Sequence, residues 1–228
     1  SAPMRKKQSR LILFFLLASF SLAIGLAACT TEKINPHFEL DSMRMATTNL
    51  VTSNGMTLPL RKWSPQGEPE AMILALHGFN DYSNAFSNPA EYWAKEGFLV
   101  YAYDQRGFGA TSGAGRWPGT GVLMQDLLGM VALLRKIHPK IPLYLLGESM
   151  GGALLIATSH HLPTETISGI ILVAPAVWAR KTMPPMYIAT LWLGAHIMPW
   201  LRLSGRGLKI QASDNRQMLL ELVQDPLV

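Results

Sequence analysis

A single serine flanked by glycines stands where an apolar, strand-like run meets an apolar, helix-like run. The stretch Leu143–Ala157 reads LYLLGESMGGALLIA, with Ser149 at its turning point. A serine on a sharp strand-to-helix turn exposes its hydroxyl at the carboxyl end of a sheet, where it can act as a nucleophile. Gly147 and Gly151 are expected where a Cβ would collide with neighbouring backbone. The five-residue pattern is short, and it is the flanking strand and helix that make it specific.

A second group of residues with chemical meaning follows an earlier apolar run. The sequence ILALHGFND places His77 and Gly78 directly after a predicted strand. In enzymes built on a nucleophile turn, an earlier loop of this kind supplies half of an oxyanion hole. By that interpretation the backbone N–H groups of Phe79 and Met150 point at the carbonyl oxygen and stabilise its developing charge. His77 is then a packing residue of the loop and not the general base.

The partners that would activate the serine are harder to find. A serine hydroxyl needs a histidine to take its proton and an acid to orient that histidine, in the chain order serine, acid, histidine. After Ser149 only Glu165 followed by His196 has this order. Glu165 falls in a loop at the opposite edge of the predicted sheet, and His160 and His161 end a helix that leads away from the serine. The acid and the base are therefore expected in residues beyond this sequence.

The elements that must position these groups alternate between strand and helix. A hairpin is predicted around Asn54-Gly55, because this dipeptide favours a tight turn between strands. Short continuous apolar runs predict strands buried on both faces, at residues 71–76, 98–103, 143–147 and 167–175. Helices are predicted between these strands, at residues 89–97, 122–138 and 151–161. Strict alternation predicts an α/β fold with a doubly wound, mostly parallel sheet.

Composition excludes several classes of site. The chain has 228 residues, of which 49% are hydrophobic, and this is enough for one sizeable core. Its 20 basic residues exceed its 15 acidic ones, but four basic residues and no acid fall before residue 29. The rest is nearly neutral, so no nucleic-acid partner is expected. No cluster of histidine, cysteine and aspartate has the spacing of metal ligands, and we expect neither a metal nor another cofactor.

The first 28 residues have the pattern of a signal peptide. Residues 1–3 precede Met4, the expected start, and a basic stretch is followed by an apolar run that ends in small residues. The sequence LAAC, which ends at Cys29, resembles the bacterial lipobox, in which the cysteine is acylated and anchors the protein to a membrane. An ordinary signal or anchor helix with an incidental cysteine is the alternative. Residues 29–42 are polar and aperiodic, and they are predicted to form a tether.

The lipobox interpretation implies a location. Cys29 is the only cysteine in the chain, so an internal disulfide is excluded and a single use as a lipid attachment site is favoured. The protein is then expected in the bacterial cell envelope, bound to a membrane through its lipid. Thr30, in place of an aspartate after the cysteine, favours the outer membrane, on the side that faces the periplasm.

Four motifs in order give the chain a family resemblance. LALHGFND, YAYDQRGFGATSG, LYLLGESMGG and GIILVAPA together resemble the α/β-hydrolases of the monoglyceride lipase and lysophospholipase group, often described as serine aminopeptidase-like. The resemblance covers about residues 45–228. It implies an α/β-hydrolase fold with a helical cap, acting on carboxylic esters of monoacylglycerol or lysophospholipid type. The core is expected at residues 43–175 and a partial cap at residues 176–228, with the last strands missing from this chain.

The cap segment is rich in tryptophan and methionine. These side chains are expected to line or cover an acyl entrance, because thioethers and flat rings adapt to varied chains. The residues are Trp178, Met183, Met186 and Trp192. Ordinary packing of the cap on the core is the other interpretation.

In the glycine-rich loop that begins at Asp104, the charged side chains are expected to hold the loop rather than to touch a substrate.

Two other interpretations of the whole chain stay open, because no suitable acid and histidine follow Ser149 in this sequence. One is a non-catalytic lipoprotein whose hydrolase-like core binds an acyl ligand. The other is a short protein with a decayed fold, against which the intact turn around Ser149 argues. On the leading interpretation, a fragment that ends at Val228 is expected to be inactive.

The anchoring hypothesis predicts the effect of removing one thiol. In a bacterial host, Cys29→Ser is expected to leave an unacylated, unprocessed precursor, because the group that carries the lipid is gone. Thr31→Ser is the matched control, and it should be processed as the wild type is. Mass spectrometry of the mature N-terminus checks the prediction. A wild-type N-terminus other than an acylated Cys29 contradicts it.

Overall fold

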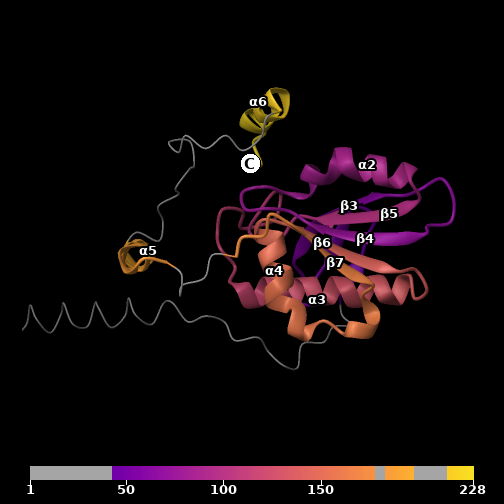
Figure 1. Cartoon of the computed structure of the whole chain (residues 1–228), viewed down its shortest axis with the longest axis horizontal. Helices are drawn as coiled ribbons and strands as arrows, with labels where there is room; N and C mark the ends of the chain where they lie inside the picture. The colour runs from indigo at the N-terminus through magenta and orange to yellow at the C-terminus, as the bar shows by residue number, and fades with distance from the viewer. Residues whose placement is uncertain (1–42, 178–182, 198–214) are drawn as a thin grey trace, which may run out of the picture. The chain divides into compact units, whose positions relative to one another are not determined.

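The computed structural model describes residues 43–177, 183–197 and 215–228 (Figure 1). The chain divides into two compact units. Residues 43–177 and 215–228 belong to one unit, and residues 183–197 belong to the other. The predicted signal peptide, Cys29 and Trp178 lie outside the described residues. The proposed boundaries of the leader, tether, core and cap therefore stay predictions.

One mixed sheet forms the centre of the larger unit. Its seven strands lie in the order β1-β2-β3-β5-β4-β6-β7. Their bounds are Arg44–Met45 (β1), Asn49–Val51 (β2), Thr57–Trp63 (β3), Ala71–Leu76 (β4), Phe98–Tyr103 (β5), Leu143–Glu148 (β6) and Gly169–Val173 (β7). The four strands β5, β4, β6 and β7 are parallel to one another, and β3 pairs antiparallel with β5. The doubly wound, mostly parallel α/β sheet predicted from the sequence is confirmed.

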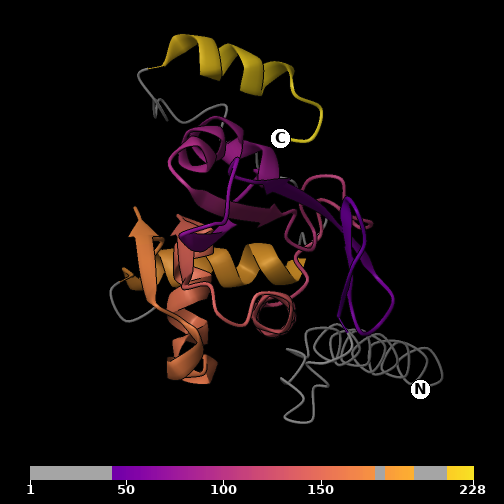
Figure 2. The same ribbon diagram turned by 90° about the vertical axis from the view of Figure 1, so that its right-hand side faces the viewer.

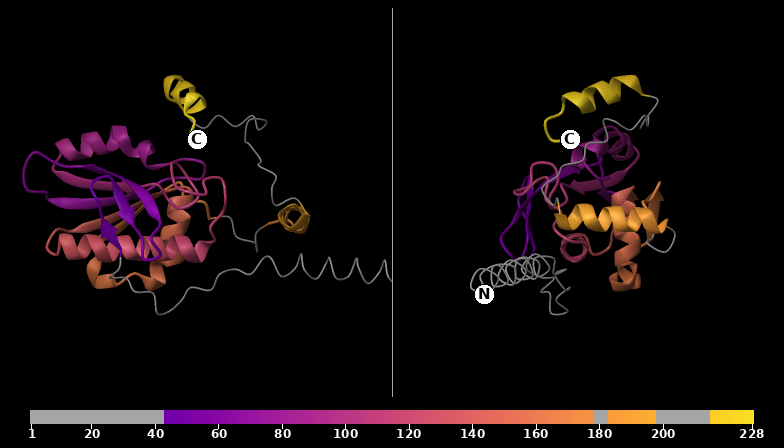
Figure 3. Two further views of the ribbon diagram at one scale, coloured as in Figure 1. Left: turned by 180° about the vertical axis from the view of Figure 1, so that it is seen from behind. Right: turned by 90° about the vertical axis from the view of Figure 1, so that its left-hand side faces the viewer.

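The predicted hairpin is present at the antiparallel end of the sheet, which Figure 3 shows from behind. Leu50 of β2 pairs with Leu58 of β3, and Gly55 in the turn has φ +80°, a conformation that glycine adopts without steric cost. The two-residue strand β1 pairs with β2 and was not expected. It is too short to give a periodic signal.

The described helices are α2 (Ser87–Lys95), α3 (Thr120–Ile137), α4 (Met150–Thr158), α5 (Pro185–Ile197) and α6 (Arg216–Gln224), with short 3-10 turns at Ser83–Phe86 (η2), Ser159–His161 (η3) and Thr164–Thr166 (η4). Both α2 and α3 begin two residues before their predicted starts. The α2 helix continues directly from η2, so Pro89 lies inside its first turn. A proline does no harm there, because an N–H at that position has no intrahelical acceptor.

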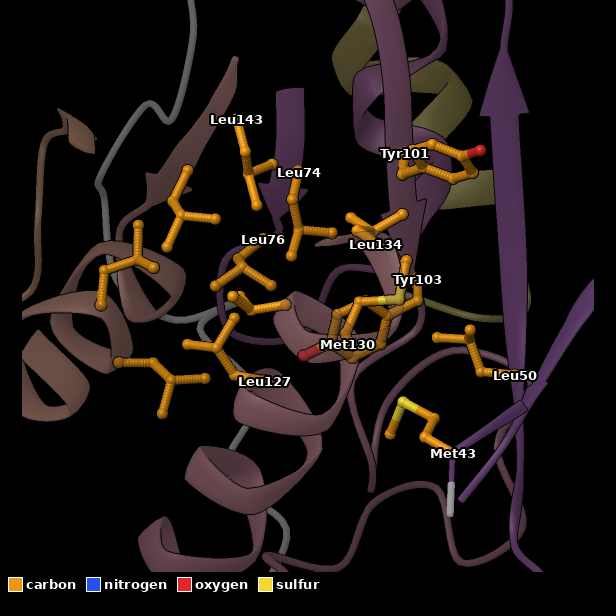
Figure 4. Close-up of a cluster of buried hydrophobic side chains, with 14 of the residues drawn as sticks. Met43, Leu50, Leu74, Leu76, Tyr101, Tyr103, Leu127, Met130, Leu134 and Leu143 are labelled. Atoms are coloured by element: carbon orange, nitrogen blue, oxygen red, sulfur yellow. The ribbon is translucent and has the colours of Figure 1, made fainter. Parts of the chain in front are cut away.

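Helices cover both faces of the parallel strands, with α2 on one face and α3 and α4 on the other (Figures 1 and 2). All six residues of β4 are buried, as their continuous apolar run predicts. On the α3 face, Leu74, Leu76 and Leu143 of the strands pack with Met130 and Leu134 of the helix (Figure 4). This core fixes the strand ends from which the site is built.

The edge strand β7 departs from the sequence prediction. Its run Ile170–Val173 was expected to be buried on both faces, and this is wrong: each side chain is 42–44% exposed. In the part of the chain that the structure describes, β7 pairs with β6 alone, so its outer edge has no partner strand. None of the helices in residues 43–177, 183–197 and 215–228 combines the length and apolar character needed to cross a bilayer.

A buried ion pair holds the glycine-rich loop between β5 and α3. The Arg106 guanidinium donates two hydrogen bonds to the Asp126 carboxylate, at 2.9 and 2.8 Å. Burial raises the pKa of Asp126 even though Arg106 stabilises its charge, so desolvation outweighs the attraction. Asp104 accepts from the N–H groups of Ser83 and Ala110, each at 3.0 Å. As expected, the charged groups of this loop serve to fasten it.

Candidate active site

Ser149 occupies a strained turn between β6 and α4. Its φ of +49° and ψ of −109° lie outside the regions that side-chain-bearing residues normally adopt. Three backbone hydrogen bonds hold it there: its N–H donates to Val173, and its carbonyl accepts from Ala153 and Ala176, at 2.9–3.0 Å. The Ser149 side chain makes no capping hydrogen bond to α4. Its hydroxyl is therefore available for other contacts.

Glycines permit close approach of the backbone at two points of this turn. A Cβ at Gly151 would lie 2.2 Å from the carbonyl oxygen of Leu76, and one at Gly147 would lie 2.6 Å from the backbone of Gly151. A Cβ at Gly78 would lie 3.5 Å from Cβ of Ser149, in ordinary contact. The loop after β4 thus lies directly against the turn that carries Ser149.

The candidate oxyanion donors come from these two segments. Met150 is the first residue of α4, where backbone N–H groups lack intrahelical acceptors and the helix carries partial positive charge. Phe79 follows Gly78 in the adjoining loop. The structure therefore brings together the segments that carry Ser149, Phe79 and Met150. This arrangement suits a reaction in which negative charge develops on a carbonyl oxygen beside the serine.

His77 is held by a closed set of hydrogen bonds that includes a residue the sequence analysis missed. Its Nδ1 lies 2.8 Å from the carbonyl oxygen of Gly78, and its Nε2 accepts from the N–H of Gln105 at 2.9 Å. The side-chain amide of Gln105 returns to the carbonyl of His77 at 2.8 Å. These residues are 28 positions apart, so no local pattern in the sequence signals the contact.

The same contacts exclude His77 as the general base. Burial lowers its pKa to about 4, although the Gly78 carbonyl and the Asp104 carboxylate partly oppose the shift. The ring is neutral near pH 7, with Nδ1–H donating to Gly78 and the lone pair of Nε2 engaged by Gln105. Neither nitrogen is free to accept a proton from Ser149. His77 and Gln105 together fix the loop that carries Phe79.

The other histidines of residues 43–177 lie away from Ser149. His138 ends α3, before the amino end of β6, and the six residues of β6 span about 20 Å. His160 and His161 lie in η3, beyond α4, whose nine residues carry the chain about 14 Å from Ser149. Within residues 43–177, then, no histidine is placed to take a proton from the serine.

The carboxylates considered as the acid do not form a triad with Ser149 either. Glu165 precedes β7, which runs parallel to β6. It therefore lies near the amino ends of these strands, whereas Ser149 lies at the carboxyl end of β6, about 16 Å away by strand length. Glu148 adjoins Ser149, and its pKa is raised by burial first and by the charge of Asp81 second. Burial also raises the pKa of Asp81. Among the described residues, no group of histidine, cysteine, aspartate and glutamate could hold a metal ion.

Three of the four predicted entrance residues fall in the described part of the chain. Met183 is half-buried, just ahead of α5. Met186 and Trp192 lie on α5 and are exposed. Trp192 stacks on His196, with ring centroids 4.3 Å apart, and the ring of His196 also bonds to the Trp192 carbonyl at 2.7 Å. These side chains belong to the smaller unit, and their role at an acyl entrance stays a prediction.

The chain matches a family model and several curated proteins. The family model described as serine aminopeptidase, S33, matches residues 67–228. The monoglyceride lipase of Rattus norvegicus is 35% identical over 133 residues, which cover 58% of this chain and 44% of that protein. The monoacylglycerol lipase of Mycolicibacterium smegmatis is 29% identical over 136 residues, or 59% of this chain and 48% of that protein. The chain thus spans less than half the length of these curated relatives.

Solved structures share the fold. A monoacylglycerol lipase from Paleococcus ferrophilus superposes with a TM-score of 0.59 at 24% identity, covering 75% of this chain and 63% of that one. A soluble variant of monoglyceride lipase from Saccharomyces cerevisiae, bound to a substrate analog, gives 0.57 at 23% identity, covering 87% and 64%. The sheet of residues 43–177 therefore has the α/β-hydrolase arrangement.

The depressed pKa of His77 predicts a pH-dependent stability. Between pH 6.5 and 4 the unfolded chain binds a proton that the folded protein does not, so the free energy of unfolding falls as the pH falls. From pH 7 to pH 5 this loss is about 2 kcal/mol. His77→Gln keeps a hydrogen-bond acceptor but cannot titrate, so this variant should lose about that much less. Denaturant unfolding at both pH values measures the difference. An equal loss of unfolding free energy in the wild type and in His77→Gln would contradict the lowered pKa of His77.

Proposed function

The chain belongs to the serine aminopeptidase family of α/β-hydrolases, and we propose that it carries the nucleophile of a serine esterase. The proposed reaction is hydrolysis of carboxylic esters of lipid-like substrates, of monoacylglycerol or lysophospholipid type, through an acyl-enzyme on Ser149. One observation carries the proposal: Ser149 is held in a strained conformation between a strand and a helix start, beside Gly78 of the loop that follows β4.

The geometry supports a two-step mechanism. The Ser149 oxygen attacks the ester carbonyl carbon while its proton passes to a histidine, and the N–H groups of Phe79 and Met150 stabilise the negative charge that forms on the carbonyl oxygen. The carbon–oxygen bond to the alcohol then breaks, and the alcohol leaves with that proton. Water attacks the resulting acyl-enzyme by the same route, releasing the acid and restoring the serine. The histidine and its acid belong to parts of the protein outside residues 43–177.

The choice of lipid-like esters rests on two supports. Two of the relatives are named monoglyceride lipase and monoacylglycerol lipase. The helix α5 exposes Met186 and Trp192, two apolar side chains of the kind that adapt to acyl chains. We further propose that acylation of Cys29 anchors the protein to a bacterial envelope membrane, where apolar esters of this kind are concentrated.

A second candidate function is a non-catalytic lipoprotein that binds acyl ligands. The observation in its favour is that no histidine of residues 43–177 is placed to activate Ser149. The two candidates share the fold and the apolar surfaces, and they differ in turnover. An ester substrate that is bound but never cleaved by the full-length protein would favour the second.

A fluorophosphonate probe tests the nucleophile, because it reacts with a serine whose proton is being removed. In the full-length protein, Ser149→Ala should abolish labelling and lower ester turnover by about four to six powers of ten. Ser159→Ala is the matched control, since Ser159 is an exposed serine at the far end of α4, and it should label and turn over as the wild type does. Labelling that persists in Ser149→Ala would overturn the proposal.

A further inference from the structure

Three aromatic side chains connect the loop beside Ser149 to the glycine-rich loop. Phe79 meets Phe108 edge to face, with ring centroids 5.4 Å apart. Phe108 meets Trp117 in the same manner at 6.4 Å. We call these three residues the aromatic strip. Phe108 also packs against His77 at 5.7 Å, so the strip rests on the histidine that fixes the oxyanion loop.

The backbone under the strip is fastened at several points. The Thr111 hydroxyl donates to the carbonyl of Phe108 at 2.7 Å and accepts from the N–H of Gly107 at 3.1 Å. The Gly115 N–H donates to the Gly107 carbonyl at 2.8 Å. A Cβ at Gly107 would lie 2.3 Å from the carbonyl oxygen of Arg116, so the two arms of the loop cross in close contact. The rings are therefore presented by a braced loop.

The two ends of the strip are open and its middle is not. Phe79 is 60% exposed and Trp117 is 55% exposed, whereas Phe108 is 8% exposed. Phe108 thus acts as the support that spaces the two outer rings. Two large exposed apolar side chains, joined through Phe108 beside a candidate active site, indicate a surface that binds an apolar ligand.

We propose that the aromatic strip is the surface on which the apolar chain of a bound ester lies, and that Trp117 is a specificity-determining residue for chain length. The proposal rests on the proposed function, since it takes the ester to be held at Ser149. Continuity with that site supports this occupant: Phe79 follows Gly78, which lies against Ser149, so a chain leaving the reacting carbonyl meets Phe79 first. Trp117, at the far end, is reached only by a longer chain.

The strip predicts a particular dependence on chain length. Full burial of one methylene tightens binding about fourfold, and contact along one side of the chain contributes about half of that free energy, or about twofold per methylene. Four added methylenes should then tighten binding about sixteenfold. Removal of the outer ring should affect long chains and spare short ones. Simple loss of packing would affect both equally.

Calorimetric titration with 1-O-butylglycerol and 1-O-octylglycerol tests the proposal, because these ethers resemble monoacylglycerols but cannot be hydrolysed. In the full-length protein we expect octylglycerol to bind about sixteenfold more tightly than butylglycerol. Trp117→Ala should reduce this ratio to about fourfold or less, and Trp117→Phe should keep most of it. Tyr92→Ala is the matched control: Tyr92 is an exposed aromatic residue on α2 (61%), outside the strip, and its removal should leave the ratio unchanged.

A second measurement does not depend on the folding of Trp117→Ala. In the wild type, the indole N–H resonance of Trp117, assigned through Trp117→Phe, should shift on addition of octylglycerol and stay in place with butylglycerol. An unshifted resonance, or an unchanged ratio in Trp117→Ala, overturns the proposal. Ester hydrolysis is assayed separately. Hydrolysis with a Trp117-independent ratio removes the strip alone, whereas a Trp117-dependent ratio without hydrolysis removes the esterase proposal and leaves the strip as a ligand surface.

Discussion

The approach of Gly151 to the carbonyl oxygen of Leu76 is the constraint on which the rest of the site depends. A Cβ added at position 151 would lie only 2.2 Å from this oxygen, so any side chain there would push α4 away from β4. Because α4 begins one residue after Ser149, this contact sets the strained turn that lifts the serine out of the sheet. Leu76 also ends the strand that leads into Gly78 and Phe79. One close contact thus positions both halves of the candidate site.

The glycine-rich loop serves the site without contributing a reacting group. Gln105 holds His77 through both its backbone and its side chain, and His77 in turn fixes the carbonyl of Gly78. Phe108 packs against the same histidine and against Phe79. The buried pair of Arg106 and Asp126 ties the loop to α3, at a desolvation cost visible in the raised pKa of the aspartate. Polar contacts thus position the loop that carries Phe79, and aromatic contacts join that loop to Phe108.

Much of the fold could be predicted from the sequence because local hydrophobic patterns indicate its strands and helices. The runs Ala71–Leu76 and Phe98–Tyr103 are continuous apolar segments, and both form the predicted strands. The start of α2 was misplaced because a 3-10 turn leads into it, so the proline at position 89 did not mark the first helical residue. The burial of β7 was overestimated, since a sequence run does not reveal whether a strand has neighbours on both sides. The contacts of His77 with Gln105 and Phe108 join distant segments, and no periodicity predicts them.

If the strained turn presents Ser149 as a nucleophile, this serine becomes acylated during turnover. Rapid acid quenching of the full-length protein during turnover of a slowly deacylating long-chain ester, followed by peptide mass mapping, detects such an acyl-enzyme. We expect a peptide spanning Ser149 that carries the mass of the acyl group, with the modification on that serine. Turnover with the acyl group on another residue, or with no acylated peptide under conditions that trap a known serine esterase, would show that Ser149 is not the nucleophile.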